Sequence, residues 1–344
     1  MKKGKKTAIS VLAICLLQMA LFSGMLLQTT AAEKRELSQG EAALGSEINW
    51  KAGDRIVGGL GSYAYGTDET DSAVQPIVWS VLDTKTNMGG AAENDGLFLV
   101  SKNVLDGTLW NEYEIRSGKY YKEGANTFAN EWEGSIAQAW CQSFYKDTIQ
   151  TSVGGEKVIL TTKTDEPITL NNCWNGNTYS YGESKIEDEY VFFLSVGETE
   201  EYFENDAQRA ASGSIIFYWT RSPHDVVGRD PRACYIHNDG TRGRHMGVDA
   251  YGARPALNLD YKDLWFKKVT DGEYIIITEE EANNSIEEVK PEQGGEEDTQ
   301  KQYIEVDGVK VEVETIQNNG PDNENIVWVI AGDGYTESEL TKYR

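Results

Sequence analysis

Short apolar runs alternate with turn-forming residues over most of this chain, which is the pattern of antiparallel strands. Residues 76–82 and 96–101 are rich in β-branched and aromatic residues, and the Gly- and Asn-rich segment 84–95 between them predicts a hairpin turn. Further strands are expected at 158–161, 190–195, 233–237 and 272–278. In the segment 233–237, the alternation places Cys234 and Ile236 on one face and Ala233, Tyr235 and His237 on the other.

Two segments have the periodicity of helices. Between Trp132 and Tyr145, large apolar residues recur every four positions and form one stripe: Trp132, Ile136, Trp140 and Phe144. A second helix is expected from Val196 to Ala211, with three residues directed inward: Tyr202, Phe203 and Ala207. The predicted fold class is α+β, with mostly antiparallel strands, two helices and long loops.

The pattern changes at both ends and divides the chain into five parts. We expect a signal peptide at 1–32, a flexible polar leader at 33–49 and the main domain at 50–278. Residues 279–302 are acidic and nearly devoid of large apolar side chains, which predicts a disordered linker. Residues 303–344 then begin with a hairpin turning at Asp307-Gly308.

The N-terminus has the three parts of a secretory signal. Four lysines among the first six residues precede an apolar run from Ala8 to Leu27, and Thr30-Ala31-Ala32 provides small residues for cleavage. The alternative is an uncleaved membrane anchor, because the run is nearly long enough to span a bilayer. Gln18 and the Thr/Ala end favour cleavage and export, so a secreted or cell-surface location without stable membrane insertion is expected.

The composition restricts the class of partner. The net charge of the chain is −24, and residues 1–32 contain four lysines and no acidic residue, so cleavage would make the charge more negative. Such a charge repels phosphate backbones and disfavours nucleic-acid binding. It is compatible with loosely bound calcium without requiring it. At most one disulfide is expected among Cys141, Cys173 and Cys234.

Two blocks carry a resemblance to a known kind of domain. They are Tyr218-Trp219-Thr220-Arg221-Ser222-Pro223 and Arg254-Pro255-Ala256-Leu257-Asn258-Leu259-Asp260, separated by a Gly-, Asp-, Arg- and His-rich stretch. From about Trp50 to Leu259 the chain resembles an uncharacterised family of secreted bacterial domains with Trp-x-Arg-Ser-Pro and Arg-Pro-Ala-Leu-x-Leu blocks. That family is distantly similar to the C-type-lectin-like fold of formylglycine-generating enzymes, and the resemblance implies this fold here. Those enzymes use a late cysteine pair, whereas Cys234 stands alone, so the oxidase chemistry is not expected.

Candidate binding residues lie in and around these blocks. Arg221 and Arg254 could grip an anion with their forked guanidinium groups; the alternative is that each satisfies loop carbonyls or a buried carboxylate. Trp174 lies in an Asn-rich segment and is the best candidate among the tryptophans for an exposed contact, whereas Trp132 and Trp140 are expected in the core. The complete set of candidates is Trp174, Trp219, Arg221, His237, Asn238, Asp239 and Arg254.

Metal sites are less well supported by the pattern. Cys234, His237 and His245 have zinc-binding residue types but lack the paired spacing of zinc sites. Strand alternation also separates Cys234 from His237, which argues against a catalytic dyad. Oxygen ligands for calcium could come from the segment 237–240 and from Asp225, Asp230 and Asp249, although Asn-Asp-Gly is more simply a turn. We therefore expect no cofactor and no catalytic residue.

The last 30 residues carry a separate resemblance. An apolar strand at Ile326–Ala331, of the buried parallel type, runs into Gly332-Asp333-Gly334-Tyr335-Thr336, where Thr336 would cap a helix. From about 316 to 344 this resembles the start of the immunoglobulin-A-peptidase type of secreted zinc metallopeptidase. No His-Glu-x-x-His motif is present, so none of that family's zinc ligands can be assigned here.

Three functions remain open at this point. The first is a non-catalytic module that binds an extracellular protein or glycan through the loops 171–189 and 224–252. The second is the N-terminal fragment of a secreted zinc metallopeptidase whose catalytic part is missing. The third is a structural protein of the cell surface.

Overall fold

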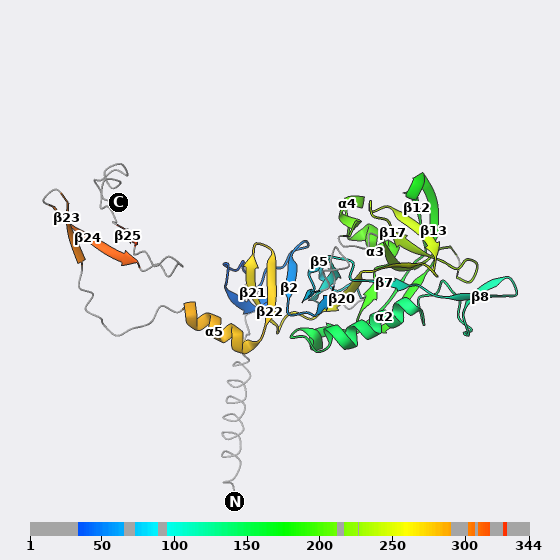
Figure 1. Ribbon diagram of the computed structural model, residues 1–344, viewed down its shortest axis with the longest axis horizontal. Coiled ribbons are helices and arrows are strands. Elements are labelled where there is room, and N and C mark those ends of the chain that lie inside the picture. Colours follow the sequence, from blue (N-terminus) through cyan, green and yellow to red (C-terminus); the bar gives the residue numbers. More distant parts are fainter. Residues whose placement is uncertain are drawn as a thin grey trace, which may run out of the picture. The chain divides into compact units, whose positions relative to one another are not determined.

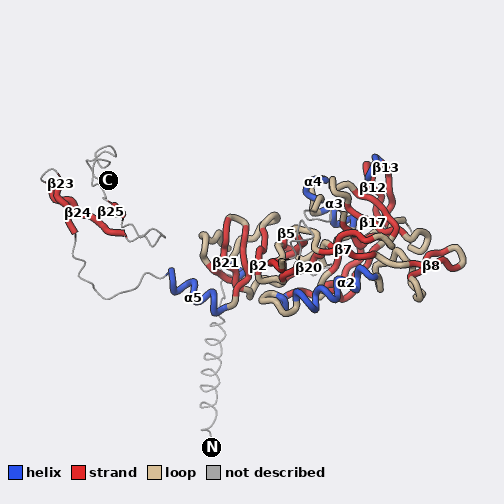
Figure 2. Tube along the Cα trace, viewed as in Figure 1, coloured by secondary structure: helices blue, strands red, loops and turns tan. Residues whose placement is uncertain are grey.

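The computed structural model describes residues 34–64, 73–88, 95–211, 217–225, 227–289, 302–306, 309–316 and 326–328. The chain divides into two compact units, Met1–Val289 and Lys290–Arg344. Strands dominate the described residues (Figure 2). The structure is therefore mainly β, with four α-helices among the described residues, in agreement with the predicted α+β class. The predicted signal peptide lies outside the described residues.

The larger sheet has nine strands. Several of them are labelled in Figure 1. In spatial order, eight of them are β1 (Ala42–Leu44), β21 (Trp265–Thr270), β22 (Glu273–Ile277), β2 (Arg55–Gly58), β5 (Trp79–Lys85), β6 (Asp95–Ser101), β20 (Pro255–Leu259) and β10 (Val158–Ile159). A ninth strand, β15 (Phe192–Phe193), also pairs with β20. β5 and β6 form the predicted antiparallel hairpin.

A second sheet has five strands and carries the first of the two sequence blocks. In spatial order they are β18 (Arg242–Met246), β17 (Arg232–Ile236), β16 (Tyr218–Pro223), β19 (Ala250–Ala253) and β7 (Asp106–Leu109). Four two-stranded ribbons accompany the sheets: β3 (Ser62–Ala64) with β4 (Val74–Pro76), β8 (Tyr113–Arg116) with β9 (Lys119–Lys122), β11 (Thr161–Asp165) with β14 (Ser184–Glu189), and β12 (Ile168–Cys173) with β13 (Asn177–Tyr181). The predicted loops 171–189 and 224–252 are thus largely hairpins.

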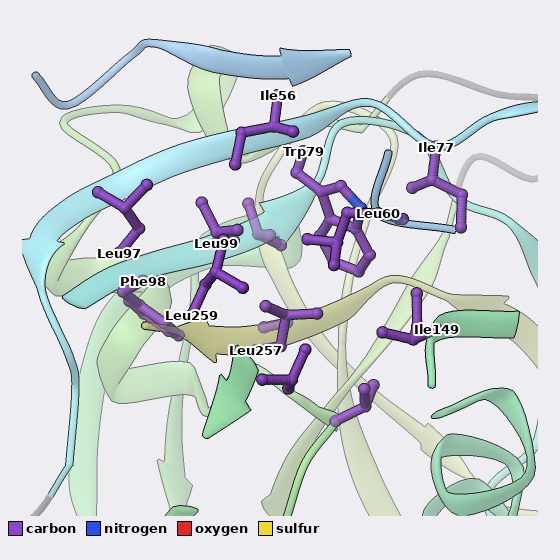
Figure 3. Packing of buried hydrophobic residues seen from close by; sticks show 14 of the residues in the cluster. Ile56, Leu60, Ile77, Trp79, Leu97, Phe98, Leu99, Ile149, Leu257 and Leu259 are labelled. Carbon is purple, nitrogen blue, oxygen red and sulfur yellow. The ribbon is translucent and has the colours of Figure 1, made fainter. Parts of the chain in front are cut away.

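The core is built from strands that are buried on both faces. In the β6–β20 pair, Leu99 lies opposite Leu257 and Phe98 lies opposite Asn258. All four residues are fully buried, because the leucines face one side of the sheet and Phe98 stacks on Phe192 at the other side. Figure 3 shows Leu99 and Leu257 in the same cluster as Trp79. Burial on both faces explains why these strands are continuous apolar runs.

The first helix is shorter than predicted and presents a different face. α2 (Ile136–Phe144) begins where the Ser135 side chain accepts a hydrogen bond from the Gln138 N–H, and it continues into a π-helical turn, η2 (Tyr145–Ile149). Its buried residues are Ala137, Cys141 and Phe144. The predicted stripe is wrong at Ile136, which is 40% exposed, because the helix starts at this residue. Trp132 is buried as predicted, but it lies before the helix.

The predicted helix 196–211 is two short helices, α3 (Val196–Glu201) and α4 (Asp206–Arg209). The break occurs because Asn205 provides a second N-cap, accepting a hydrogen bond from the Gln208 N–H. Phe203 is buried between the two helices, but Ala207 is exposed, so its predicted inward direction is wrong.

Both predicted flexible segments flanking the main domain contain ordered structure. In the leader 33–49, β1 pairs with β21, Leu37 is buried, and its carbonyl accepts a hydrogen bond from Lys268 Nζ. In the linker 279–302, residues Glu279–Val289 form α5, which buries Ala282 against β1 and β21. Each segment contains at least one apolar residue that is buried in the fold, which the overall polarity of the segment conceals. None of the helices in the described residues has the length and apolar character needed to cross a bilayer.

The described residues of the second unit form three antiparallel strands, β23 (Gln302–Val306), β24 (Val309–Ile316) and β25 (Ile326–Trp328). The predicted hairpin is confirmed, because Val306 pairs with Val309 across residues 307 and 308. The strand at 326 pairs antiparallel with β24, so the prediction of a parallel-type strand is wrong. The Gly-Asp-Gly-Tyr-Thr segment and the helix expected after it lie outside the described residues.

Three short 3-10 turns complete the first unit: η1 (Gly45–Glu47), η3 (Gly155–Lys157) and η4 (Trp174–Gly176). The last of these is the tip of the β12–β13 hairpin, where Trp174 is located.

Candidate binding surface

The predicted binding residues fall into two groups in the structure. Trp219, Arg221 and Arg254 are 0%, 0% and 4% exposed, so they cannot contact a ligand in solvent and their assignment as binding residues is corrected. The other group is Trp174, His237, Asn238 and Asp239, which lies at the surface.

The two terminal nitrogens of the Arg221 guanidinium find their partners within the protein, whereas its buried Nε has none among the described residues. Its guanidinium donates to both carboxylate oxygens of Glu198, at 2.6 and 2.9 Å, to the Phe193 carbonyl at 2.6 Å, and to Asp165. Lys163 also lies 2.9 Å from Glu198. Of the two alternatives that the sequence left open for Arg221, the structure therefore confirms the second, in which a buried carboxylate is its partner.

Arg254 and Trp219 also have structural roles. Arg254 donates to the carbonyls of Ser101 and Arg209 and to the Tyr218 hydroxyl, each at 2.9 Å. The Trp219 ring nitrogen donates to the Thr108 carbonyl at 3.0 Å. Arg254 thus links the ends of β6 and α4 to β16, because one guanidinium can satisfy several carbonyls at once.

A buried polar network joins the two sequence blocks. Glu198, the partner of Arg221, accepts a hydrogen bond from the Asn87 side chain at 2.5 Å, and Asn87 in turn bonds to Asn258 of the second block. Glu198 also completes a capping box with Ser195 at the start of α3. Burial alone would raise the pKa of Glu198, but Arg221 and Lys163 outweigh this effect and hold its pKa at about 2. The two sequence blocks thus have a structural role.

Sequence analysis did not identify Glu198, although a signal was present. Ser195 followed three residues later by Glu198 is the capping-box pattern. A glutamate in this pattern is fixed at a helix start, where it can serve as an anion for a buried arginine.

The exposed group of candidates lies where two hairpin tips meet. Trp174 at the β12–β13 tip is 40% exposed and stacks on His237 at the start of the β17–β18 turn, with ring centroids 5.8 Å apart. Asp239 accepts hydrogen bonds from the backbone and side chain of Thr241, so 238–240 form a closed turn. The residues predicted from 171–189 and 224–252 are thus brought together at this point.

Further aromatic rings extend this contact across the five-stranded sheet. We define the aromatic row as Trp174, His237, Phe217, Tyr251 and His245, whose successive ring centroids are 5.8, 4.7, 5.6 and 5.3 Å apart. All five rings are at least partly exposed. Tyr235 and Trp219 lie against them as a buried layer. The row therefore presents several ring faces and edges on one side of the sheet.

Gly243 makes room for the buried layer. It lies directly opposite Tyr235 in the β17–β18 pair, and a Cβ at this position would be 2.5 Å from the Tyr235 ring. The tyrosine ring can therefore lie across β18, beneath Tyr251 and His245. A side chain here would displace the ring that supports the middle of the aromatic row.

A pocket opens at the His245 end of the row. Its volume is about 360 Å³, and it is lined by Tyr120, Arg229, Asp230, Pro231, Arg232, Arg244, His245 and Met246. Three arginines and one carboxylate line this small space, in a chain whose net charge is −24. The pocket is therefore a local region of positive charge.

The three pocket arginines have different partners. Arg232 forms an ion pair with Asp230. Arg244 lies 4.7 Å from the Tyr179 ring centroid and donates to His224 Nε2 at 2.8 Å. Burial, followed by the charge of Arg244, lowers the pKa of His224 to about 4, so this imidazole is neutral at pH 7 and can accept the bond. Arg229 is exposed and has no ion pair among the residues described.

The sequence contained a signal for this pocket that was not used. Arginine occurs at 229, 232, 242 and 244, within a chain where acidic residues far outnumber basic ones. Such a local reversal of charge is a recognised indication of an interaction surface. The remaining rings of the row, Phe217 and Tyr251, had no comparable signal.

The residues considered for metal binding are not brought together. Cys234 faces a small cluster with Cys173 and Tyr181, whereas His237 faces the aromatic row on the other side of β17. Asp230 pairs with Arg232, and His245 Nδ1 lies 2.7 Å from Asp249. Within the described ranges, no three His, Cys, Asp or Glu side chains are grouped to hold a metal ion.

Three cysteines in the described residues, Cys141, Cys173 and Cys234, are free and buried. Cys173 accepts a contact from the Tyr181 hydroxyl at 3.6 Å. Burial raises the pKa of both the Cys141 and the Cys234 thiols. These two side chains therefore behave as small apolar core residues.

Residues 94–261 match the family model of a domain of unknown function (DUF6273). The match covers both sequence blocks, the aromatic row and the pocket, and it agrees with the expected uncharacterised domain. No curated protein matches the chain. No solved structure matches it either.

Proposed function

We propose that this chain is a secreted or cell-surface, non-catalytic module that binds an extracellular glycan. The aromatic row carries this proposal. Sugar rings have apolar faces that pack on aromatic side chains, and partly exposed rings on a rigid sheet lose little entropy on binding. Among extracellular proteins and glycans, the row favours a glycan, because its rings form a narrow series rather than a broad apolar patch.

The supporting scaffold is consistent with this function. The buried Arg221–Glu198 network and the Tyr235–Trp219 layer fix the strands beneath the row. A preformed surface of this kind binds without large rearrangement. No cofactor is part of the proposal.

We further propose that residues 50–278 have a C-type-lectin-like fold. The support is the two mainly antiparallel sheets, the short helices and the recognition surface formed by hairpins between the two sequence blocks. The alternative of a metallopeptidase fragment rests on residues 316–344, most of which lie outside the described part of the chain.

Export is expected to remove the first 32 residues. The small residues at 30–32 fit a signal-peptidase site, and the basic and apolar regions precede it. N-terminal sequencing of protein recovered from the culture medium should therefore begin at Glu33. A chain found only in the cells with Met1 intact would contradict this part of the proposal.

Trp174→Ala is expected to weaken glycan binding at least tenfold. Trp174 is the most exposed residue of the row, at 40%, and truncating an aromatic contact in a binding site typically costs about 2 kcal/mol. The measurement is a glycan array followed by titration calorimetry with the purified chain. Tyr190→Ala is the matched control, because Tyr190 is an exposed ring (36%) that stacks on Tyr145 away from the row.

Equal affinity in Trp174→Ala and the unaltered chain would remove the row from the site. A chain that binds no glycan on the array but retains an extracellular protein would replace the glycan by a protein partner.

A further inference from the structure

We propose that the glycan is acidic, and that the pocket beside His245 holds its carboxylate or sulfate group. This inference rests on the proposed function, because it assigns the ligand class of the same surface. It adds a second subsite to the aromatic row.

The pocket adjoins the row at His245 and continues around the edge strand β18 to the other face of the sheet, where Arg244 lies opposite Cys234 and packs on Tyr179. His245 lines the pocket and is also the last ring of the row, 5.3 Å from Tyr251. A chain of sugars lying along the row would therefore pass the edge of the sheet at His245 to place an acidic group in the pocket. The volume of about 360 Å³ falls within the usual range of small-ligand sites and accommodates a sugar residue.

The charges of the pocket select an anion. Asp230 is the one carboxylate in the lining, and it is already neutralised by Arg232. Arg244 is bonded to a neutral histidine and Arg229 has no ion pair in the described part of the chain, so both keep their positive charge for a ligand. Planar guanidinium groups bind carboxylate and sulfate through paired hydrogen bonds. A neutral sugar would leave these two charges without a counterion.

The net charge of the chain does not prevent this binding. At physiological ionic strength, charges more than about 8 Å apart in solvent are largely screened. The negative charge of the chain, −24, therefore slows the approach of an anion. The arginines of the pocket determine the binding free energy once the anion is in contact with them. Binding is expected to weaken as salt is added.

The test compares oligogalacturonate with its carboxyl-reduced, neutral counterpart. Arg229→Glu should lower the affinity for oligogalacturonate at least tenfold and leave the affinity for the neutral oligosaccharide within twofold. Arg229 is suited to this test because it has no ion pair within the part of the chain that the structure describes, so the variant should fold. Arg55→Met is the control, since it removes a partly exposed arginine, paired with Glu273, from the nine-stranded sheet.

A second variant tests the pocket through another arginine, so that the result does not depend on Arg229 alone. Arg244→Gln should also weaken oligogalacturonate selectively, with its thermal midpoint measured in parallel because Arg244 packs on Tyr179. A sulfated oligosaccharide should behave like oligogalacturonate. Inorganic phosphate should compete only weakly, because it cannot contact the row.

The outcomes separate this inference from the proposed function. If the neutral oligosaccharide binds as well as the acidic one and Arg229→Glu changes neither, the acidic subsite is overturned and the row remains. If Trp174→Ala leaves the affinity for oligogalacturonate unchanged while Arg229→Glu lowers it, the pocket is part of the binding site and the aromatic row is not. A poly-glutamate peptide that binds as tightly as oligogalacturonate, with the same dependence on Arg229, would overturn the assignment to a glycan.

Discussion

Glu198→Ala is expected to lower the free energy of unfolding by about 3–5 kcal/mol, the usual cost of breaking a buried ion pair from one side. The substitution leaves Arg221 fully buried without its bidentate partner, and it removes a second anion from Lys163. Asp165 alone would have to compensate both cations. Urea denaturation monitored by tryptophan fluorescence measures the change.

The control for this prediction is Glu187→Ala. Glu187 pairs with Lys185 on the surface, and both side chains are more than half exposed. Its removal should leave the denaturation midpoint unchanged within error, because solvent screens such pairs. If the denaturation midpoint of Glu198→Ala were as close to that of the unaltered chain as the midpoint of Glu187→Ala is, the network would not hold the sheets together.

Replacing both partners should cost less than the single changes suggest. In Glu198→Met with Arg221→Met, Lys163 keeps Asp165 at 3.2 Å, and no buried charge is left unpaired. Apolar replacements of buried ion pairs are often nearly neutral. The double variant is therefore expected to lose less unfolding free energy than the sum of the losses of the two single variants.

Glu198 also sets part of the dependence of the unfolding free energy on acidic pH. The pKa of Glu198 is about 2 in the folded chain, against an ordinary value of 4.5. A carboxylate with a depressed folded pKa stabilises the fold above its unfolded pKa, and this stability is lost as the pH falls from about 4.5 towards 2. Glu198→Ala should lack this part of the loss when unfolding is measured across that pH range.

Gly240→Ala is the second change with a large expected effect, a loss of roughly 3–5 kcal/mol in unfolding free energy. Gly240 has φ of 82°, which costs an alanine about 1–2 kcal/mol. The added Cβ would also lie 1.7 Å from the Asp206 carbonyl oxygen, so the turn or the start of α4 must move. Overpacking against backbone adds further cost.

Gly118→Ala isolates the backbone contribution. Gly118 has a similar φ of 75°, but nothing lies within 4 Å of its added Cβ. Thermal unfolding of the two variants should show the smaller loss for Gly118→Ala. Equal losses would mean that the contact with Asp206 relaxes at no cost.

Local pattern was sufficient wherever the structure depends on neighbours in the sequence. The β5–β6 hairpin, the hairpin at 302–316 and the two faces of 233–237 were predicted because a period of two fixes which side chains share a face. The pattern failed at Ile136 and Ala207, where capping by Ser135 and Asn205 sets the helix starts and hence the buried face.

The candidate site could be predicted only in part. Trp174 was identified by its polar surroundings and is exposed, whereas Arg221 and Arg254 have the residue type of a binding site and are buried. An arginine beside proline looks the same whether its partner is solvent or a carboxylate from a distant segment. The partner of Arg221 is 23 residues away in the sequence, and that of Asn258 is 171 residues away.

By itself, the sequence determined the mainly β class and the strands with the clearest apolar runs, because these depend on local periodicity and on residue type. Only the tertiary structure decided which arginines are buried, and it assembled the aromatic row and the cationic pocket. The rings of the row come from positions 174, 217, 237, 245 and 251, on separate strands and hairpin tips. Strand pairing, which depends on contacts between distant segments, brings them onto one face.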